Sequence, residues 1–367
     1  MNNAEHAIEL WRAGVAAVDG YTATKNALPG IAKPDRILAV GKPAAAMTRA
    51  ALDHFPDVPA LVVTKDDHGR ELPDGVQVIE ASHPVPDDRS LAGGRALREA
   101  IEAMEPGTHL LLLVSGGASS LAEDLLPGTS LGDLAALNRQ LLSDGLDIAT
   151  MNTERRKLSR VKGGGLLSHF NGAKVTVLAI SDVPGDDLSV IGSGIGALPG
   201  TYDYEAATHI IASNAHARSA AVDLAMQRNL PILANEESLH DDYLAVAAKL
   251  GPKLRNMDRG VMVFGGEPTV VLPATPGRGG RNQALALALA REISGCAGLT
   301  VVVGGTDGTD GPTLAAGGIV TGHTWRDGAQ AALEQADSGH FLEKADALLV
   351  TGPTGTNVMD LIVAVRD

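Results

Sequence analysis

Short apolar segments that end at glycine-rich or polar loops, and alternate with alanine-rich stretches, constrain the fold of this chain more than any other feature. Arg36 to Val40 ends at Gly41 to Pro43, and the alanine-rich stretch Ala44 to Leu52 follows. His109 to Val114 ends in the same way at the loop Ser115 to Ser120. Segments of this length suit buried strands, and intervening helices make such strands parallel. We therefore predict an α/β fold whose larger domain has a doubly wound, mostly parallel, Rossmann-like sheet.

The same alternation continues over most of the sequence and predicts two domains, because 367 residues exceed one ordinary core. We expect a larger N-terminal domain over residues 1–235 and a smaller α/β domain over residues 236–367, with the boundary in the charged stretch that begins at Glu236. Further strands are expected at 60–64, 76–81, 174–180, 260–264, 269–272, 299–303 and 361–365, and helices at 4–18, 91–104, 212–228 and about 283–293. Ligands of such sheets bind beyond the carboxyl ends of the strands, where the polar loops fall.

Charge and cysteine content exclude several classes of protein. The net charge of −14 argues against nucleic acid or an anionic membrane as the main partner. The only cysteine is Cys296, so no disulfide framework or cysteine metal site is expected, and a reducing compartment is indicated. Met1 to Trp11 lacks the apolar core of a signal peptide, and no apolar run reaches the roughly 20 residues of a membrane span. We expect a cytoplasmic protein that acts on a small-molecule substrate, and the sequence leaves a homodimer open.

The loop from Ser115 to Ser120 is built from small side chains directly after an expected strand. Free backbone N–H groups and hydroxyls at such a place can hold an anion. The alternative is a tight turn that binds nothing. The loop is not a Walker P-loop, because the pattern G-x-x-x-x-G-K-[ST] does not occur in this sequence. We favour an anion site.

Positive charge gathers at three of the expected loops of this acidic chain. Lys42 follows a strand end, where an ammonium can hold a transferring phosphoryl group. Arg281 follows two glycines at a helix start, where a guanidinium can clamp a phosphate or carboxylate. The third place is a basic run before three glycines, Arg155, Arg156, Lys157, Arg160 and Lys162. At most two or three of the run can converge on one ligand. A solvated surface is the alternative for Lys42 and for the run.

Asp307 and Asp310 lie in a glycine-rich loop after an expected strand. Mg²⁺ usually keeps several waters and takes one or two carboxylates together with phosphate oxygens. We therefore predict that these aspartates hold Mg²⁺ or its waters; the alternative is that they only shape a surface turn. Asp182, Asp186 and Asp187 follow another strand and support the same argument more weakly.

Other site classes fail on spacing. The sequence has no H-E-x-x-H zinc motif, no G-x-S-x-G nucleophile elbow and no complete calcium-loop pattern. His83 stands in a proline-rich turn, where a structural role is the more common one, although it can act as a base.

Taken in order, these loops resemble those of the type II glycerate kinases, the MOFRL-type glycerate 2-kinases, over nearly the whole chain. The matching stretches of the first half are 40–42, 82–87, 115–120, Asn152, Arg155, 158–159, 162–164 and 181–187. Those of the second half are 266–267, 279–283, 305–313 and 351–357. Each match alone can arise by chance, but their joint order is highly specific.

The resemblance implies transfer of the ATP γ-phosphoryl group to the 2-hydroxyl of D-glycerate, which gives 2-phosphoglycerate and ADP. It also implies two α/β domains with the active site in the cleft between them. The family's essential lysine and arginine fall on Lys42 and Arg281, and its acidic loop falls on Asp307 and Asp310.

We therefore expect catalytic roles for Lys42, Arg281 and Asp307, Mg²⁺ at Asp307 and Asp310, and substrate contacts from Arg155 and Asp182. ATP and its phosphates are expected at Ser115, Gly116, Gly117, Ser119, Ser120, Lys162, Gly266, Glu267, Asn282 and Asn357.

The chain departs from the family pattern at a few positions. Arg156 and Lys157 stand where the family usually has lysine and histidine. Pro268 replaces a threonine, Leu314 replaces a common aspartate, and Ile195-Gly196 replaces Pro-Thr. The phosphate-handling loops are intact, so these departures leave the acceptor hydroxy acid open rather than the reaction type.

Three other functions stay open beside a D-glycerate kinase. One is a kinase for a related hydroxy acid. Another is a hydroxypyruvate reductase-type oxidoreductase, which needs a dinucleotide site; no G-x-G-x-x-G with an acid about 20 residues later follows the first strands. The third is a catalytically weak binding protein, which the full set of charged loop residues disfavours.

Overall fold

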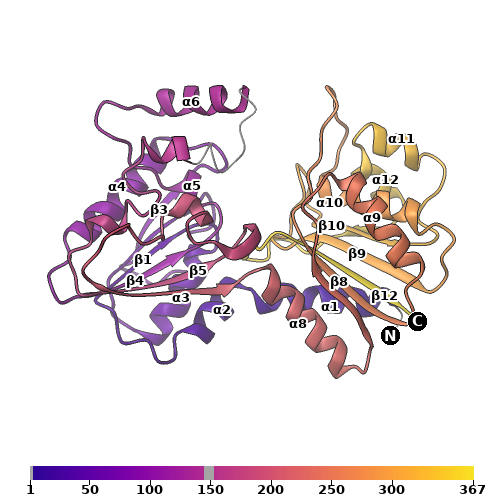
Figure 1. The fold of residues 1–367 in the computed structure, drawn as a ribbon, viewed down its shortest axis with the longest axis horizontal. Coiled ribbons are helices and arrows are strands. Elements are labelled where there is room, and N and C mark those ends of the chain that lie inside the picture. The colour runs from indigo at the N-terminus through magenta and orange to yellow at the C-terminus, as the bar shows by residue number, and fades with distance from the viewer. Residues whose placement is uncertain (1–2, 144–152) are drawn as a thin grey trace. The chain divides into compact units, whose positions relative to one another are not determined.

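A computed structural model describes residues 3–143 and 153–367 of the chain (Figure 1). The chain forms two compact units, one of Gly20–Ile211 and one of Met1–Asp19 together with Ala212–Asp367. This division differs from the predicted domains, 1–235 and 236–367. The opening helix α1 (Asn3–Ala17) packs on α8 (Asn214–Gln227), and β7 (Ile232–Glu237) pairs with β8 (Gly260–Gly266), so all four elements belong to the second unit.

The unit Gly20–Ile211 has one six-stranded sheet in the order β3-β2-β1-β4-β5-β6. The ladders between β3, β2, β1, β4 and β5 are all parallel, which is the Rossmann arrangement. The predicted fold class is therefore confirmed for this unit. Its strands are β1 (Arg36–Val40), β2 (Ala60–Lys65), β3 (Gln77–Ala81), β4 (His109–Val114), β5 (Lys174–Ile180) and β6 (Glu205–Ala212).

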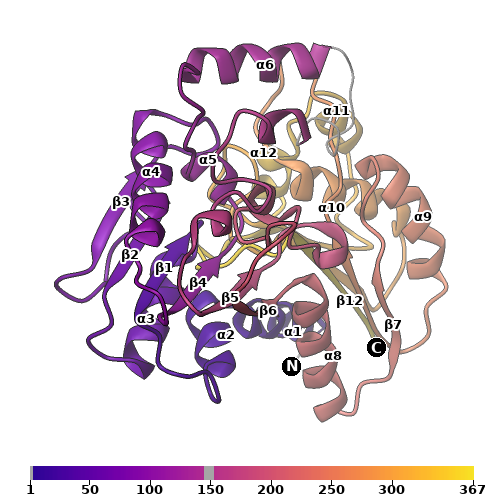
Figure 2. The ribbon, with the colours of Figure 1, turned by 60° about the vertical axis from the view of Figure 1, so that its left-hand side comes forward.

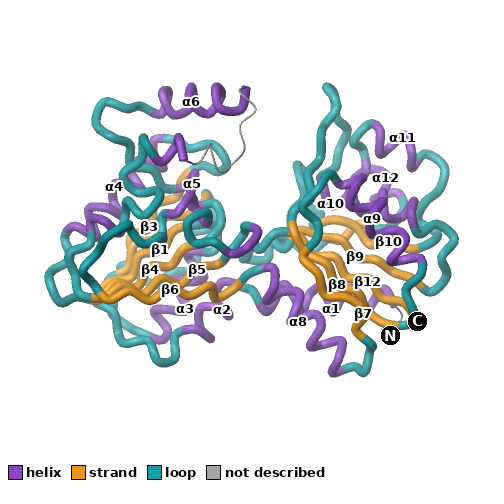
Figure 3. The backbone as a smooth tube through the Cα atoms, in the orientation of Figure 1, coloured by secondary structure: helices purple, strands orange, loops and turns teal. Residues whose placement is uncertain are grey.

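Helices cover both faces of this sheet, as Figure 3 shows. Alternate residues of each strand face opposite sides, so Leu38 and Val40 pack in one cluster with Leu97 and Ile101 of α4 (Asp88–Glu102). Helix α3 (Ala44–His54) packs on β1 and β2 and is joined by α2 (Gly20–Ala27). Two further helices are α5 (Ala118–Leu121), which follows β4 directly, and α6 (Leu131–Ser143).

The second unit has a mixed six-stranded sheet in the order β11-β10-β9-β12-β8-β7. The last strand, β12, lies at its centre and runs antiparallel to both β8 and β9. The remaining elements are α9 (Tyr243–Arg255), α10 (Arg281–Glu292), β9 (Leu299–Gly305), β10 (Gly317–Thr321), α11 (Ala329–Glu334), α12 (Ser338–Lys344), β11 (Leu348–Leu349) and β12 (Asp360–Arg366).

Strand β12 shows why helices are needed on both faces of this second sheet. Its residues Leu361, Val363 and Val365 pack with α1 and α8, while Ile362 and Ala364 pack with α10 on the other side. Figure 2 shows α1 beside α8. A continuous apolar strand of this kind is buried on both faces. Within the described residues, no helix is long and apolar enough to cross a membrane.

One predicted strand is wrong, and several observed strands, among them β6, β7 and β10, were not predicted. Residues 269–272 form an isolated bridge at Thr269 followed by an exposed loop, in which the Val271 side chain is 86% exposed. The edge strand β6 has one buried residue, Ala212, and its sequence lacks a long apolar run. Strand β10 begins with two glycines, which pair closely with β9. Because glycine normally weakens a strand, the sequence did not indicate one here.

Gly94 in α4 tests this packing. A Cβ atom there would lie 2.6 Å from the backbone nitrogen of Glu123 and closer still to its carbonyl group. We expect Gly94→Ala to lower the free energy of unfolding by about 1–3 kcal/mol, since backbone cannot move aside as a side chain can. Gly132→Ala on α6 is the control, because the nearest atom to its Cβ is a serine oxygen 3.4 Å away. Equal chemical-denaturation midpoints for both variants would contradict the close approach of α4 to Glu123.

Candidate functional site

The loops after β1 and β4 lie directly against each other. The backbone N–H of Lys42 donates to Gly116 O at 2.9 Å, and Thr64 Oγ1 donates to Gly41 O at 2.9 Å. A Cβ atom at Gly41, whose φ is +128°, would overlap the Ser115 hydroxyl. The structure therefore brings together the Lys42 turn and the Ser115 loop, as expected for carboxyl ends of neighbouring parallel strands.

Gly116 and Gly117 let three polar side chains approach the same backbone. A Cβ atom at Gly116 would lie 2.7 Å from Cγ of Asp182. One at Gly117 would lie 3.1 Å from Lys42 Cγ and 3.3 Å from His83 Cδ2. Gly117 also has φ +85°, which favours glycine. Lys42, His83 and Asp182 therefore surround this pair of glycines.

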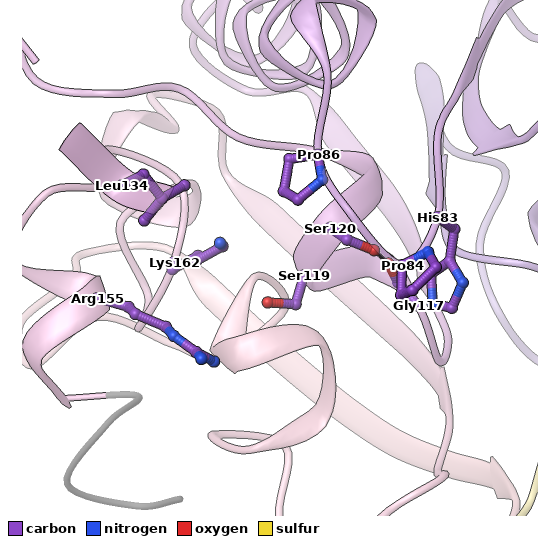
Figure 4. Close-up of a pocket in the computed structure, with 9 residues that line it drawn as sticks. All are labelled: His83, Pro84, Pro86, Gly117, Ser119, Ser120, Leu134, Arg155 and Lys162. Carbon is purple, nitrogen blue, oxygen red and sulfur yellow. Dashed lines mark hydrogen bonds between the residues drawn. The ribbon is translucent and has the colours of Figure 1, made fainter. Parts of the chain in front are cut away.

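A pocket of about 270 Å³ opens beside Gly117 (Figure 4). Ser119 and Ser120 of α5 lie near its centre, with His83 on one side and Arg155 and Lys162 on the other. The remaining lining residues are Pro84, Pro86, Gly117 and Leu134. Hydroxyls, two cations and an imidazole in one concave site can bind a small anion.

Lys162 enters this pocket from a buried ion pair. Its side chain is 3% exposed, and Nζ lies 2.5 Å from Oε2 of the fully buried Glu123. The Ser159 hydroxyl also donates to Glu123. Glu123 was not predicted, because a lone glutamate after an apolar helix carries no sequence signal of burial. A fully buried carboxylate needs such partners to stay charged.

The basic run divides between this pocket and other partners. Arg155 lines the pocket, and burial lowers the pKa of its guanidinium. Arg156 donates instead to the Ser189 carbonyl, and Lys157 pairs with Glu154 at 2.7 Å. Arg155 and Lys162 are thus the members of the run that line this pocket. Asn152, which the family resemblance includes, lies outside the described residues.

A second cluster of predicted residues surrounds Arg281 in the other unit. Arg281 Nε donates to Oδ2 of Asp360 at 2.8 Å, and Nη1 donates to Oε1 of Glu267 at 2.6 Å. Burial alone would lower the pKa of Arg281, but the two carboxylates outweigh it and raise that pKa. Glu267 follows Gly266, which ends β8 with φ +133°. Arg281 and Glu267 therefore share one ionic cluster, with a partner, Asp360, that the sequence did not indicate.

Asp310 caps helix α10 in this structure. Its Oδ1 accepts from the backbone N–H of Asn282 at 3.0 Å, and its Oδ2 accepts from that of Gln283 at 2.8 Å. A carboxylate at a helix N-terminus satisfies otherwise unpaired N–H groups. Burial raises the pKa of Asp310 to about 7, against the opposite effect of these two donors.

Asp307 shapes the neighbouring turn. Its Oδ1 accepts from the backbone N–H of Thr309 at 3.0 Å and from the Thr309 hydroxyl at 3.1 Å. Asn357, also predicted at the nucleotide, accepts a hydrogen bond from the Met359 N–H at 3.4 Å. In the described ranges, no three acidic, histidine or cysteine side chains are arranged to enclose a metal ion. Mg²⁺ binding at Asp307 and Asp310 therefore stays a prediction. One or two carboxylates would hold the ion together with phosphate oxygens of the nucleotide.

The raised pKa of Asp310 predicts a pH dependence of stability. A carboxyl whose folded pKa lies near 7, above its ordinary 3.8, favours the folded state at low pH, and this contribution is lost as pH rises through about 7. We expect the free energy of unfolding of the wild type to fall relative to Asp310→Asn between pH 4 and 7, by on the order of 1 kcal/mol per pH unit. Denaturant titrations at several pH values measure this, with the exposed Asp258→Asn as control. Parallel curves for wild type and Asp310→Asn would contradict it.

Comparison with known proteins gives this geometry its context. The domain of unknown function DUF4147 matches residues 6–227, and the MOFRL family matches residues 260–360. A D-glycerate 2-kinase of Thermotoga maritima is 36% identical over 97% of this chain and 97% of its own. A crystal structure of a glycerate kinase from Thermotoga maritima has a TM-score of 0.91 and 32% identity, covering 99% of each chain.

A further relative carries a different name. A protein of Agrobacterium vitis, provisionally named a hydroxypyruvate reductase, is 33% identical over 96% of this chain and 92% of its own. Identities of this size over nearly complete chains confirm the resemblance on which the sequence analysis relied. The chain belongs to the MOFRL-type glycerate 2-kinase family.

Proposed function

We propose that the protein is a glycerate 2-kinase, which transfers the γ-phosphoryl group of ATP to the 2-hydroxyl of D-glycerate and releases 2-phosphoglycerate and ADP. The observation that carries the proposal is the pocket at the carboxyl end of β4, in a chain 36% identical to a D-glycerate 2-kinase. Its two cations, Arg155 and Lys162, stand opposite the hydroxyls of α5. A volume of about 270 Å³ suits a small anion.

The Ser115 loop and Lys42 are the groups of this unit that we assign to phosphate. Gly116 and Gly117 have no side chains of their own, so a ligand can approach their backbone N–H groups closely, beside Lys42, His83 and Asp182. Lys42 adds a positive charge next to Gly117. Phosphoryl transfer depends mainly on positioning and on charge stabilisation, so neither group needs to form a covalent bond.

In the other unit we assign Arg281 to the developing charge on the transferring phosphoryl group. Glu267, Asn282 and Asn357 stay assigned to the nucleotide side, and Asp182 and Arg155 to the acceptor. ATP brings Mg²⁺ with it, and we assign this ion to Asp307 and Asp310 beside the phosphate oxygens. In this structure both oxygens of Asp310 accept backbone N–H groups, and Asp307 accepts from Thr309. When bound, Mg²⁺ neutralises phosphate charge.

An oxidoreductase acting on hydroxypyruvate is the second candidate. The Rossmann strand order and the name of the Agrobacterium vitis relative favour it. The loop after β1, however, reads Gly41-Lys42-Pro43 and lacks the glycine spacing of a dinucleotide site. Consumption of NADH on addition of hydroxypyruvate, without ATP, would support this candidate over the kinase.

The reaction is tested with Mg-ATP and D-glycerate, coupled to enolase with phosphoglycerate mutase left out. We expect a signal without mutase, because enolase accepts 2-phosphoglycerate directly. A signal that requires mutase would mean 3-phosphoglycerate and would overturn the position of transfer. No signal under either condition, with ATP bound, would mean that the acceptor is a hydroxy acid other than D-glycerate.

Neutralising the assigned cations tests the mechanism. We expect Lys42→Ala and Arg281→Ala each to lower kcat by about 10²-fold or more, since each removes charge stabilisation from the transition state. Lys174→Ala and Arg291→Ala are matched controls that should keep wild-type kcat. Lys174 begins β5, at the end of the strand away from the site, and Arg291 lies in the last turn of α10. Near-normal turnover by either test variant, with an unchanged thermal midpoint, would remove that residue from the mechanism.

A further inference from the structure

Asp360 is a buried carboxylate directly behind Arg281. Its side chain is 2% exposed, and both of its oxygens accept from the Arg281 guanidinium, Oδ2 from Nε at 2.8 Å and Oδ1 from Nη2 at 3.2 Å. Asn282 Nδ2 adds a third hydrogen bond to Oδ1 at 2.8 Å. This two-oxygen contact holds the plane of the guanidinium as well as its position.

The backbone around Asp360 is shaped to leave space for its carboxylate. Asp360 opens β12, where it pairs with Gly266 of β8 on one side and with Gly305 of β9 on the other. A Cβ atom at Gly305 would lie 3.3 Å from both Asp360 Oδ1 and Asn282 Nδ2. Asn214 Nδ2 donates to the Asp360 carbonyl at 2.9 Å. The carboxylate therefore has a fixed position at the carboxyl ends of two strands.

The other partner of Arg281 differs in exposure. The Glu267 side chain is 43% exposed, against 2% for Asp360. An exposed ion pair contributes little and exchanges readily, whereas breaking a buried pair leaves an uncompensated charge. Arg281 thus has one permanent contact and one that an anionic ligand can replace. Buried pairs often do not increase stability over apolar packing, so stability alone does not account for this one.

We infer that Asp360 is a positioning residue for Arg281. It holds Nε and Nη2 of the guanidinium in place. Nη1, which donates to Glu267 in this structure, is then the nitrogen that donates to a phosphoryl or carboxylate oxygen of the ligand. The inference rests on the proposed function, in which Arg281 contacts the transferring phosphoryl group. Fixing a catalytic group before the ligand arrives lowers the barrier through orientation, and a misplacement of about 1 Å can cost about 10²-fold in rate.

The test is Asp360→Asn, which keeps the shape and removes the charge. We expect kcat to fall by about 10²-fold while KM for ATP and for D-glycerate changes much less. In an Arg281→Ala background the same change should have almost no further effect, because Asp360 acts through Arg281. Glu292→Gln is the matched control. Glu292 is the last residue of α10, at the end opposite Arg281; its carboxylate pairs with Arg255 and is 19% exposed.

Two outcomes overturn the inference: wild-type kcat in a folded Asp360→Asn protein, or an equal fractional loss in the Arg281→Ala background. The second result, with a lowered thermal midpoint, would mean a structural role only. If Asp360→Asn does not fold, Asp360→Glu decides the inference, since it keeps the charge but moves the carboxylate. This variant should lower kcat in the wild-type background only.

If the wild type does not phosphorylate D-glycerate, the proposed function fails separately from this inference. The inference is then decided by crystal structures of the wild type and of Asp360→Asn: the Arg281 guanidinium should lose its present orientation in the variant, and an unchanged orientation would overturn the inference.

Discussion

Both units depend on glycines at which a neighbouring loop or side chain approaches the backbone too closely for a Cβ atom. At the carboxyl ends of β1 and β4, Gly41 and Gly116 let two loops and the Asp182 carboxylate occupy space that any Cβ atom would fill. At the end of β9, Gly305 does the same for Asp360. In each case the free space is taken by a polar or charged group rather than by an apolar one. Glycine at these places therefore determines where charge can be buried in the protein.

Buried charge is held differently in the two units. Lys162 and Glu123 form a closed pair beneath the pocket, both almost fully buried. Arg281 instead bridges a buried carboxylate and an exposed one. The first pair has no exposed partner to exchange, whereas the second can exchange Glu267 for a ligand without leaving Asp360 uncompensated. The two clusters thus hold their positive charges in physically different ways.

The sequence predicted the elements whose signal is local. The apolar runs of β1, β4 and β5 and the loops after them were placed correctly, because a buried parallel strand reads as a continuous apolar segment. The domain boundary and strand β6 could not be predicted in this way, since both depend on which distant segments pair. The same holds for Glu123 and Asp360: only the fold brings one to Lys162 and the other to Arg281. The roles of Lys42, Arg281 and Asp307 at the ligand stay predictions.

The position of α1 has a consequence for the order in which the chain can fold. Residues Gly20–Ile211 are continuous in sequence, so that unit has all its strands before the remainder is synthesised. Helix α1 is made before that unit, yet Trp11 donates to the Leu361 carbonyl at 3.1 Å, on strand β12. Its partner surface does not exist until β12 has been synthesised. The second unit must therefore close a loop that contains the whole first unit, a step whose entropic cost is smaller once that unit has folded and brought its ends into place.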